Sequence, residues 1–284
     1  MSTGPAVPAA LRDAAPSLRC PRCAEPVEVD GRSLRCVHRH SFDLARQGYV
    51  NLLSRPAGAA ADDAAMVAAR QEILASGLYA PLTDGLAAAA RALDLPPGVV
   101  VDVGAGTGHH TAAVLEALPD RIGIALDLSV YAARRAARAH PRLAALVDDV
   151  WEGLPVADGT AALVVDVFAP RNVAEFDRVL APGGAVLVVT PAPTHLTELV
   201  TELDMPRVDP RKAERLAETF ARYSPGPIRR VRETLHVPGP VAAAVARMGP
   251  GAHHVSPAAL DALSAGAGEV EVTFAVDVST FLRA

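Results

Sequence analysis

The chain of 284 residues lacks any long apolar run, because charged residues, proline or glycine interrupt each one. A bilayer-spanning helix needs roughly 18 or more such residues in succession. The first 20 residues also lack a basic region followed by an apolar one, since Asp13 and several prolines interrupt them. The sequence therefore predicts a cytoplasmic protein that has no membrane partner.

Lysine is nearly absent, and Lys212 is the only one among the 27 basic side chains. The net charge of −5 argues against a general nucleic-acid coat protein. The charge is divided unevenly, however. Residues 1–55 hold eight arginines and five acidic residues, so this segment carries +3 and the remainder −8. A basic N-terminal segment thus precedes an acidic body.

Cysteine is scarce too, and all three cysteines lie close together, at Cys20, Cys23 and Cys36. Three cysteines cannot form two disulfides. A CxxC pair followed by Cys36 with His38 and His40 has the spacing of a Cys3His zinc site. We expect a structural zinc ribbon in which His40 is the fourth ligand, because a CxH pair with His38 would be cramped. A redox CxxC is the alternative, but it leaves Cys36 and the histidines unexplained.

Apolar strand patterns alternate with helical patterns through most of the remaining chain. The strand patterns are VVVDV, IGIALDLS, LAALVDD, ALVVDVF and AVLVVT, and each precedes a turn or a helix. Such alternation predicts an α/β fold with a doubly wound parallel sheet. Residues 62–95 predict two amphipathic helices before the first of these strands. We expect four units: a flexible tail (1–17), the zinc ribbon (18–54), a helical linker (55–97) and the α/β domain (98–284).

A glycine-rich turn follows the first strand and contains Gly104, Gly106 and Gly108. A dinucleotide fingerprint, GxGxxG, would place its third glycine where His109 stands. Asp102 before the turn and Asp127 at the end of the second strand provide two carboxylates beside it. S-adenosylmethionine fits this arrangement, with its amino acid part at the turn and its ribose hydroxyls at Asp127. The sequence predicts a Rossmann-like class I methyltransferase, and the alternative is a similar domain that has lost its ligand.

Two more strand ends carry candidate site residues. Asp149 follows the third strand, where such folds contact the adenine amino group, and Asp148 is its competitor. The fourth strand leads into Phe168, Arg171 and Asn172, at the sheet edge where open α/β folds bind their substrates. We expect this loop to hold the methyl acceptor. The alternative is an ordinary connection in which Asn172 caps the following helix.

These stretches together resemble the RlmA family of bacterial large-subunit ribosomal RNA guanine-N1 methyltransferases, and more closely its Gram-positive tylosin-resistance branch. The resemblance spans nearly the whole chain. Its matching stretches are CPRC with CVHRH, SFDLARQGYVNLL, DAAMVAAR, SGLYAPL, VDVGAGTGHH, RRAARAHP, DVFAPRN, APGG, VVTP with His195-Leu196, and Met248-Gly249-Pro250. The segment ARQGYVNLL directly after a zinc ribbon is far more specific than any glycine turn.

The resemblance implies a zinc ribbon that helps to grip RNA, a methyltransferase domain that uses S-adenosylmethionine, and a homodimer with an RNA-sized cleft. The implied substrate is a guanine at the tip of a 23S rRNA hairpin that lines the peptide exit tunnel. Macrolides bind nearby, so the methylation would contribute to macrolide resistance. Arginines of the basic segment would then hold RNA phosphates, namely Arg32, Arg35, Arg39 and Arg46.

The implied chemistry assigns roles to residues near the sheet edge. Guanine N1 becomes a nucleophile only as its proton leaves, so the reaction needs a base or a water path. His195 is our candidate for that base or for orienting the edge of the guanine; the alternative is a histidine that merely opens a helix. Phe168 would stack on the guanine and Arg171 would bind its O6, with Asn172 in the same loop. A surface arginine is the alternative for Arg171.

One position departs from the family pattern. His253 stands after Met248-Gly249-Pro250, where the family usually has a tryptophan. An imidazole offers a flipped base less stacking area than an indole. Together with the acidic body, this keeps two alternatives open: a small-molecule methyltransferase recruited from the family, and a non-catalytic RNA-binding homologue with a vestigial cofactor site.

Overall fold

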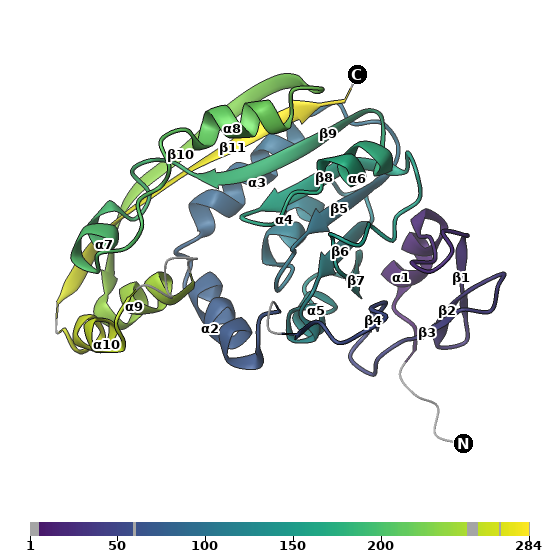
Figure 1. Ribbon diagram of the computed structural model, residues 1–284, viewed down its shortest axis with the longest axis horizontal. Coiled ribbons are helices and arrows are strands. Elements are labelled where there is room, and N and C mark those ends of the chain that lie inside the picture. Colours follow the sequence, from purple (N-terminus) through teal and green to yellow (C-terminus); the bar gives the residue numbers. More distant parts are fainter. Residues whose placement is uncertain (1–5, 59–60, 249–254, 267, 284) are drawn as a thin grey trace.

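The computed structural model describes residues 6–58, 61–248, 255–266 and 268–283, which form a small antiparallel sheet beside a large one (Figure 1). The small sheet has the order β1 (Val27–Asp30), β2 (Ser33–Cys36), β3 (Ser41–Asp43). A two-residue turn at Gly31 joins β1 to β2, with a φ of 58° at the glycine. This hairpin brings Cys36 back towards the CxxC pair.

The large sheet has eight strands in the order β10-β11-β9-β8-β5-β6-β7-β4. β11 runs antiparallel to both of its neighbours, β10 and β9. All the other neighbouring strands of this sheet pair in parallel. The predicted Rossmann-like α/β fold is confirmed, and the structure adds the reversed strand β11. The strands are β4 (Tyr49–Asn51), β5 (Val99–Val103), β6 (Gly123–Asp127), β7 (Leu143–Val147), β8 (Ala161–Val167), β9 (Leu180–Pro191), β10 (Ser224–Pro238) and β11 (Glu269–Leu282).

Two hydrophobic clusters lie on opposite faces of this sheet, because successive strand residues point to opposite sides. Val101 belongs to one cluster and Val100 to the other. α1 (Ala9–Ala14), α6 (Val173–Val179) and α8 (Lys212–Thr219) cover the first face. The second face is covered by α2 (Ala64–Ala75), α3 (Ala80–Arg91), α4 (His109–Ala117), α5 (Val130–Ala136), α7 (Thr197–Glu202), α9 (Gly239–Met248) and α10 (Pro257–Ala265).

No single helix of the described residues is long and apolar enough to span a membrane. The bent pair α2 and α3 passes the same test of length and apolar composition when the two are taken together.

The segment before the ribbon differs from the sequence prediction of a flexible tail over residues 1–17. Residues 9–14 form α1 and residues 15–17 a 3₁₀ turn. Leu11 and Ala14 are buried in the first hydrophobic cluster together with Leu18. The apolar face of AALRDA, which the alanine- and proline-rich composition obscures, therefore docks residues 6–17 against the protein.

The structure also packs together segments that the predicted boundaries separate. β4 lies within the predicted ribbon (18–54), yet it pairs in parallel with β7 and forms one edge of the large sheet. α3 lies within the predicted linker (55–97), yet Leu82, Leu86 and Ala90 on it are fully buried against that sheet. Ribbon and linker are thus parts of one structure with the methyltransferase fold (Figure 1).

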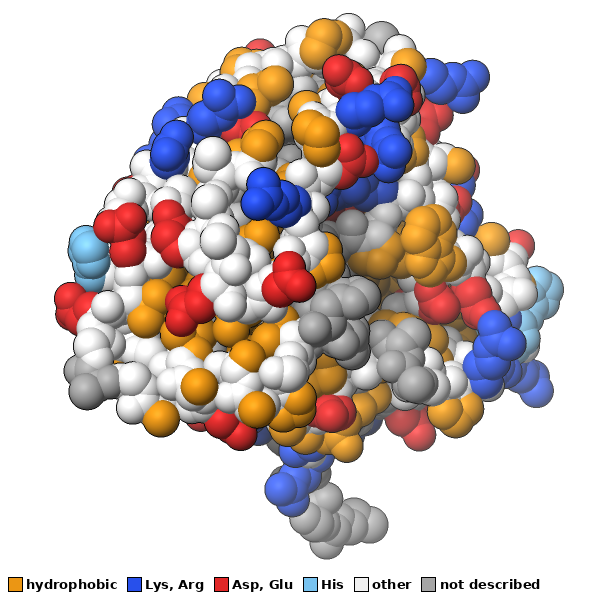
Figure 2. Space-filling model, turned by 60° about the vertical axis from the view of Figure 1, so that its left-hand side comes forward, with side chains coloured by type: hydrophobic (Ala, Val, Ile, Leu, Met, Phe, Trp, Pro, Cys, Tyr) orange, Lys and Arg blue, Asp and Glu red, His pale blue; other side chains and the backbone are white. Residues whose placement is uncertain are grey.

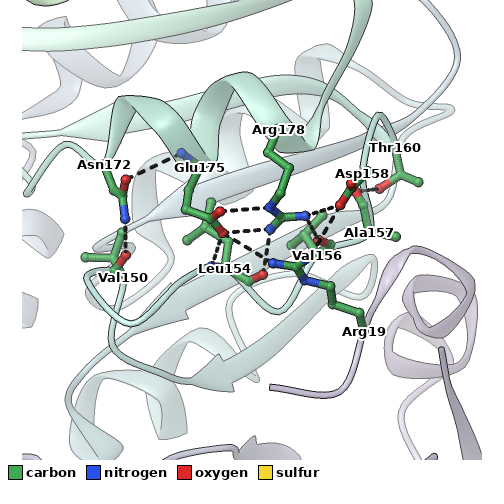
Figure 3. A network of polar contacts seen from close by, with 10 residues as sticks. All are labelled: Arg19, Val150, Leu154, Val156, Ala157, Asp158, Thr160, Asn172, Glu175 and Arg178. Atoms are coloured by element: carbon green, nitrogen blue, oxygen red, sulfur yellow. Dashed lines mark hydrogen bonds and ion pairs between the residues drawn. The ribbon is translucent and has the colours of Figure 1, made fainter. Parts of the chain in front are cut away.

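A polar network joins the ribbon to the main sheet (Figure 3). Arg19, next to the first cysteine, lies 3.3 Å from Asp158 and 3.6 Å from Glu175. Arg178 on α6 binds the same two carboxylates at 2.6 and 2.7 Å. A β-bridge between Leu18 and residue 156 lies alongside. These contacts give the ribbon a fixed position relative to the sheet.

Candidate functional site

A cavity of about 730 Å³ opens at the carboxyl ends of β5 to β9. The sheet order reverses between β5 and β8, and open α/β folds bind ligands at such a reversal. The volume is in the range of small-ligand and cofactor pockets. On the face drawn in Figure 2, Lys and Arg side chains lie above a hollow that hydrophobic side chains also border.

Asp127 ends β6 at the edge of this cavity. Its Oδ2 accepts a hydrogen bond from the Gly106 backbone at 2.8 Å, and its Oδ1 accepts one from the Ser129 backbone at 2.8 Å. Burial raises the pKa of Asp127, and these two bonds oppose the rise. Each carboxylate oxygen keeps a second lone pair. The predicted acceptor for two ribose hydroxyls is therefore held rigidly at the cavity wall.

Asp102 lies near the end of β5 and is almost fully buried. Its Oδ2 accepts a hydrogen bond from the Thr111 hydroxyl, whereas its Oδ1 has no hydrogen-bond partner among the described residues. Burial raises the pKa of Asp102 to about 7. An unpartnered buried oxygen is costly, and a cationic or N–H ligand relieves that cost. The unpartnered carboxylate oxygen of Asp102 thus fits the ammonium of an amino acid.

The three glycines of the turn have different surroundings. Gly104 has a φ of 68°, and a Cβ there would lie 2.6 Å from the side chain of Ala169. Gly104, Gly106 and His109 line the cavity, as predicted. Gly108 is not among the residues that line it. It precedes α4, where a Cβ would lie 3.0 Å from Leu143, so the absence of a side chain there allows close packing.

Asp148 and Asp149 both line the cavity after β7. Oδ1 of Asp148 accepts a hydrogen bond from the Asp149 backbone at 2.9 Å, and burial raises the pKa of Asp148 to about 7. Oδ1 of Asp149 accepts one from the Trp151 backbone at 3.0 Å. Trp151 lines the cavity with an exposed fraction of 63%. Both carboxylates therefore lie at the cavity, on the side where the sequence predicts the adenine.

Phe168 and His195 lie on the opposite wall. Phe168 has a φ of 56°, a left-handed conformation that is strained for an aromatic residue, and its side chain is 45% exposed. Its ring lies nearly parallel to that of His195, with centroids 6.4 Å apart. Nδ1 of His195 accepts a hydrogen bond from the Ala275 backbone at 3.2 Å. Burial lowers the pKa of His195 to about 4.

Arg171 lines the same wall, and Asn172 does not. Nε of Arg171 lies 3.4 Å from Oδ1 of Asp166, which is completely buried at the end of β8. Asn172 caps α6: its Oδ1 accepts from the Glu175 backbone, and its Nδ2 donates to the Val150 carbonyl at 3.0 Å (Figure 3). Both polar ends of Asn172 are thus engaged, and the predicted catalytic role gives way to the capping alternative.

The four predicted metal ligands meet in the ribbon. Ligand atoms of Cys20, Cys23, Cys36 and His40 all lie within 4.8 Å of one another. Nδ1 of His40 is 3.4 and 3.5 Å from two of the sulfurs, and Cys23 is 3.7 Å from Cys36. Tetrahedral zinc, with bonds of about 2.0 to 2.3 Å, separates its ligand atoms by about 3.5 to 3.8 Å. The spacing therefore fits zinc, and His38 is not part of the cluster.

Comparison with known proteins places this geometry in a family. Residues 18–57 match the family model described as RlmA, N-terminal, and residues 100–184 match a methyltransferase domain. A Streptomyces fradiae protein named 23S rRNA (guanine(748)-N(1))-methyltransferase is 52% identical over 243 residues, which cover 84% of this chain and 87% of the relative. The chain belongs to the RlmA family of 23S rRNA (guanine-N1)-methyltransferases.

A second relative agrees with this RlmA-family assignment, and a solved structure agrees with the fold. A Micromonospora griseorubida protein, named as a putative 23S rRNA (guanine-N(1)-)-methyltransferase, is 48% identical and covers 95% of this chain and 98% of its own length. The YcgJ protein of Bacillus subtilis is 16% identical with a TM-score of 0.50, over 70% of this chain and 98% of that one, and shares the fold. The RlmA-family chain is thus an S-adenosylmethionine-dependent methyltransferase with a zinc ribbon.

The four arginines of this RlmA-family ribbon that are predicted to contact RNA differ in their partners and in their exposure. Arg32 donates to the Leu44 carbonyl at 3.2 Å and braces the ribbon. Arg35 forms an ion pair with Asp30 at 2.7 Å. Arg39 and Arg46 are exposed. His253, Gly249 and Pro250 lie outside the described residues.

Sequence reasoning missed several side chains that line the cavity. Arg70 on α2 forms an ion pair with Asp62 beside Gly106, although the sequence shows these residues only as parts of a helix. Trp151 and Lys212 follow no motif. A signal did exist for Lys212, since it is the only lysine of the chain.

Proposed function

We propose that this protein transfers a methyl group to N1 of a guanine in a 23S rRNA hairpin near the peptide exit tunnel. The relatives' names supply the substrate class. The observation that carries the proposal is the ribbon with exposed Arg39 and Arg46, fixed by the Arg19 network to a sheet that ends in a cofactor-sized cavity. An RNA held at the ribbon would present one base to that cavity.

The carboxylates that line the cavity would bind the cofactor. S-adenosylmethionine supplies an activated methyl group on a sulfonium. Asp127 would accept the ribose hydroxyls, and Asp102 would pair with the ammonium group. Asp148 and Asp149 would lie at the adenine. Gly104, Gly106 and His109 would complete the set around the amino acid part.

The side chains of the opposite wall would bind the guanine that accepts the methyl group. Phe168 would stack on the guanine. Because Nδ1 of His195 accepts the Ala275 N–H, a neutral ring carries its proton on Nε2 and donates there. A donor with a pKa of about 4 is suited to hold O6 of the guanine rather than to remove its N1 proton. We therefore propose that His195 orients the guanine, and that the proton leaves to water.

The direct test is incubation of the protein with S-adenosylmethionine and protein-free 23S rRNA, followed by nuclease digestion and mass spectrometry. We expect 1-methylguanosine in the digest. A small-molecule methyltransferase is the second candidate, favoured by the net charge of −8 outside residues 1–55. An unmodified RNA together with methylation of a co-purified metabolite would support that candidate instead.

We also propose that the protein acts in the cytoplasm as a homodimer and contributes to macrolide resistance, as the family resemblance implies. β10 forms the outer edge of the sheet and pairs on one side only, and Ile228 on it is largely exposed, which leaves room for a partner. Light scattering tests the dimer. Expression in a sensitive host tests the resistance, which should rise for a macrolide such as tylosin.

A further inference from the structure

The inward face of α8 contains the only lysine of the chain. Leu216 on this helix and Phe220 just after it are buried in the core, and Lys212 lies one turn before Leu216 on the same side. The remaining positions of the helix are exposed, whereas Lys212 is partly buried. Lysines are rarely buried without a partner, so the partly buried position of Lys212 needs an explanation.

The side chain of Lys212 lies at the wall of the cavity. Lys212 lines the same cavity as Phe168, Arg171 and His195. Among the described residues, no hydrogen bond or ion pair engages its ammonium group. Asp209 is the nearby acid, but its carboxylate binds Arg215 at 3.0 Å and the backbone of residue 211.

Two cations therefore converge on one wall of the cavity. Burial lowers the pKa of Lys212, the positive charge of Arg171 lowers it further, and Asp209 opposes both. Arg171 is held from behind by Asp166, and His195 adds a donor beside them. The like charges of Lys212 and Arg171 repel one another, and Asp209 and Asp166 offset only part of this repulsion. An anionic oxygen between the two cations would relieve this repulsion, as in sites that stabilise developing negative charge.

The proposed substrate develops such a charge. As guanine N1 loses its proton, the negative charge spreads from N1 to O6. We propose that Lys212 is a catalytic residue that, together with Arg171, binds O6 of the target guanine and stabilises this charge. The inference rests on the proposed function, since it concerns the same reaction and the same cavity.

The electrons and the proton of this step balance without a further reagent. The N1–H bond breaks and its proton goes to water. The electron pair of N1 forms a bond to the methyl carbon. The bond from that carbon to sulfur breaks, and its pair returns to the sulfur, which becomes a neutral thioether. Lys212 keeps its proton throughout and contributes charge alone.

The test is the pH dependence of methylation by the full-length protein at saturating S-adenosylmethionine and 23S rRNA. We compare the wild type with Lys212→Ala, Lys212→Arg and the control Arg211→Ala, which removes an exposed charge from the adjacent position. Without Lys212, N1 ionises less readily, so the rising limb of the rate should move to higher pH. We expect Lys212→Ala to lower kcat about 10- to 100-fold, with the RNA KM changed less than about 3-fold.

Two controls separate a catalytic role from a structural one. Lys212→Arg keeps the charge and should recover most of the rate, and Arg211→Ala should match the wild type. Wild-type kcat and pH profile in Lys212→Ala would overturn the inference. A rise in KM with a weaker salt dependence and an unchanged pH profile would overturn it too, because it would show a contact to an RNA phosphate. A wild-type protein that does not methylate rRNA would instead overturn the proposed function and this inference with it.

Discussion

Asp102 has a carboxylate oxygen that no described residue satisfies, and it lies where the cofactor ammonium would bind. Burial holds the pKa of Asp102 at about 7, far above the ordinary value for an aspartate. Below pH 7 the free protein thus holds a proton on Asp102. A cationic ligand prefers the ionised carboxylate, so its binding must displace this proton.

We predict that S-adenosylmethionine binding strengthens as the pH rises from about 5.5 to 7, by at most about tenfold per unit for each proton released. Asp102→Asn should bind more weakly at pH 7.5 and show a shallower pH dependence. The remaining slope comes from Asp127 and Asp148, since burial raises their pKa values as well. Calorimetry at three pH values measures this. Equal slopes in the wild type and Asp102→Asn would show that Asp102 does not meet the ammonium.

Residues at strand ends were predictable because their signal is local. Asp127 ends a buried strand and Asp102 is the last residue but one of another, and parallel strands bring their carboxyl ends to one edge. Trp151 was not predictable as a site residue, because no motif ties the loop after β7 to that edge. For Lys212 the only signal was that it is the single lysine of the chain, and no motif ties α8 to the same edge. Asn172 shows the opposite case: its loop was placed correctly, but the sequence could not decide between capping α6 and facing the cavity.

At the scale of elements, α6 ties the ribbon to the sheet through Glu175 and Arg178. The side chains of this pair are only 18% exposed each, and Arg178 also donates to the carbonyls of Leu154 and Val156. α8 offers a matched comparison, because Arg211 and Glu214 form a pair at the same i,i+3 spacing with side chains more than 60% exposed. Exposed pairs contribute little to stability, whereas breaking a buried one leaves an unpaired charge.

We predict that Arg178→Ala lowers the free energy of unfolding by about 2 to 4 kcal/mol, and that Arg211→Ala changes it by less than about 0.5 kcal/mol. Urea unfolding measures both. Arg178 holds the pKa of Glu175 below its ordinary value, so the stabilisation is present above that value and is lost as the pH falls through the lowered pKa. Similar losses in the two variants would mean that α6 does not anchor the ribbon.

The ribbon itself is an element that depends on its metal, since its small sheet is too short to fold alone. We predict one zinc per chain. Cys20→Ser and His40→Ala should lower the metal content and loosen the ribbon, while His38→Ala keeps the zinc because His38 is outside the cluster. Elemental mass spectrometry reports the metal. Full zinc occupancy in His40→Ala would refute the ligand set.

At the scale of the whole molecule, the basic ribbon and the acidic body point to a division of labour. Arg39 and Arg46 would bind RNA phosphates, and each such contact contributes about 0.7 to 0.9 to the slope of log affinity against log salt. We predict that the double variant Arg39→Ala/Arg46→Ala loses up to about 1.8 of that slope, with kcat at saturating RNA unchanged. Arg35→Ala is the control, because Arg35 already pairs with Asp30. An unchanged slope in the double variant would move RNA binding away from the ribbon.

The whole-molecule arrangement was only partly predictable. Strand patterns and the zinc spacing gave the fold class and the ribbon, since both are short-range signals. The docking of α1 and the pairing of β4 with β7 were not foreseen, because they depend on contacts between segments about 100 residues or more apart. These contacts make the ribbon part of a single structure, so that an RNA bound there would lie at a fixed distance from the cavity.

Reverse transcription tests most directly whether the protein methylates one rRNA guanine at N1. A methyl group on N1 blocks the Watson–Crick edge, so primer extension stops at the modified base. We predict that 23S rRNA treated with the protein and S-adenosylmethionine gives one new strong stop, at a guanine in a hairpin loop, and that omitting the cofactor abolishes it. If the folded protein binds the cofactor and primer extension still proceeds through every guanine of the treated RNA, the protein does not methylate 23S rRNA at guanine N1.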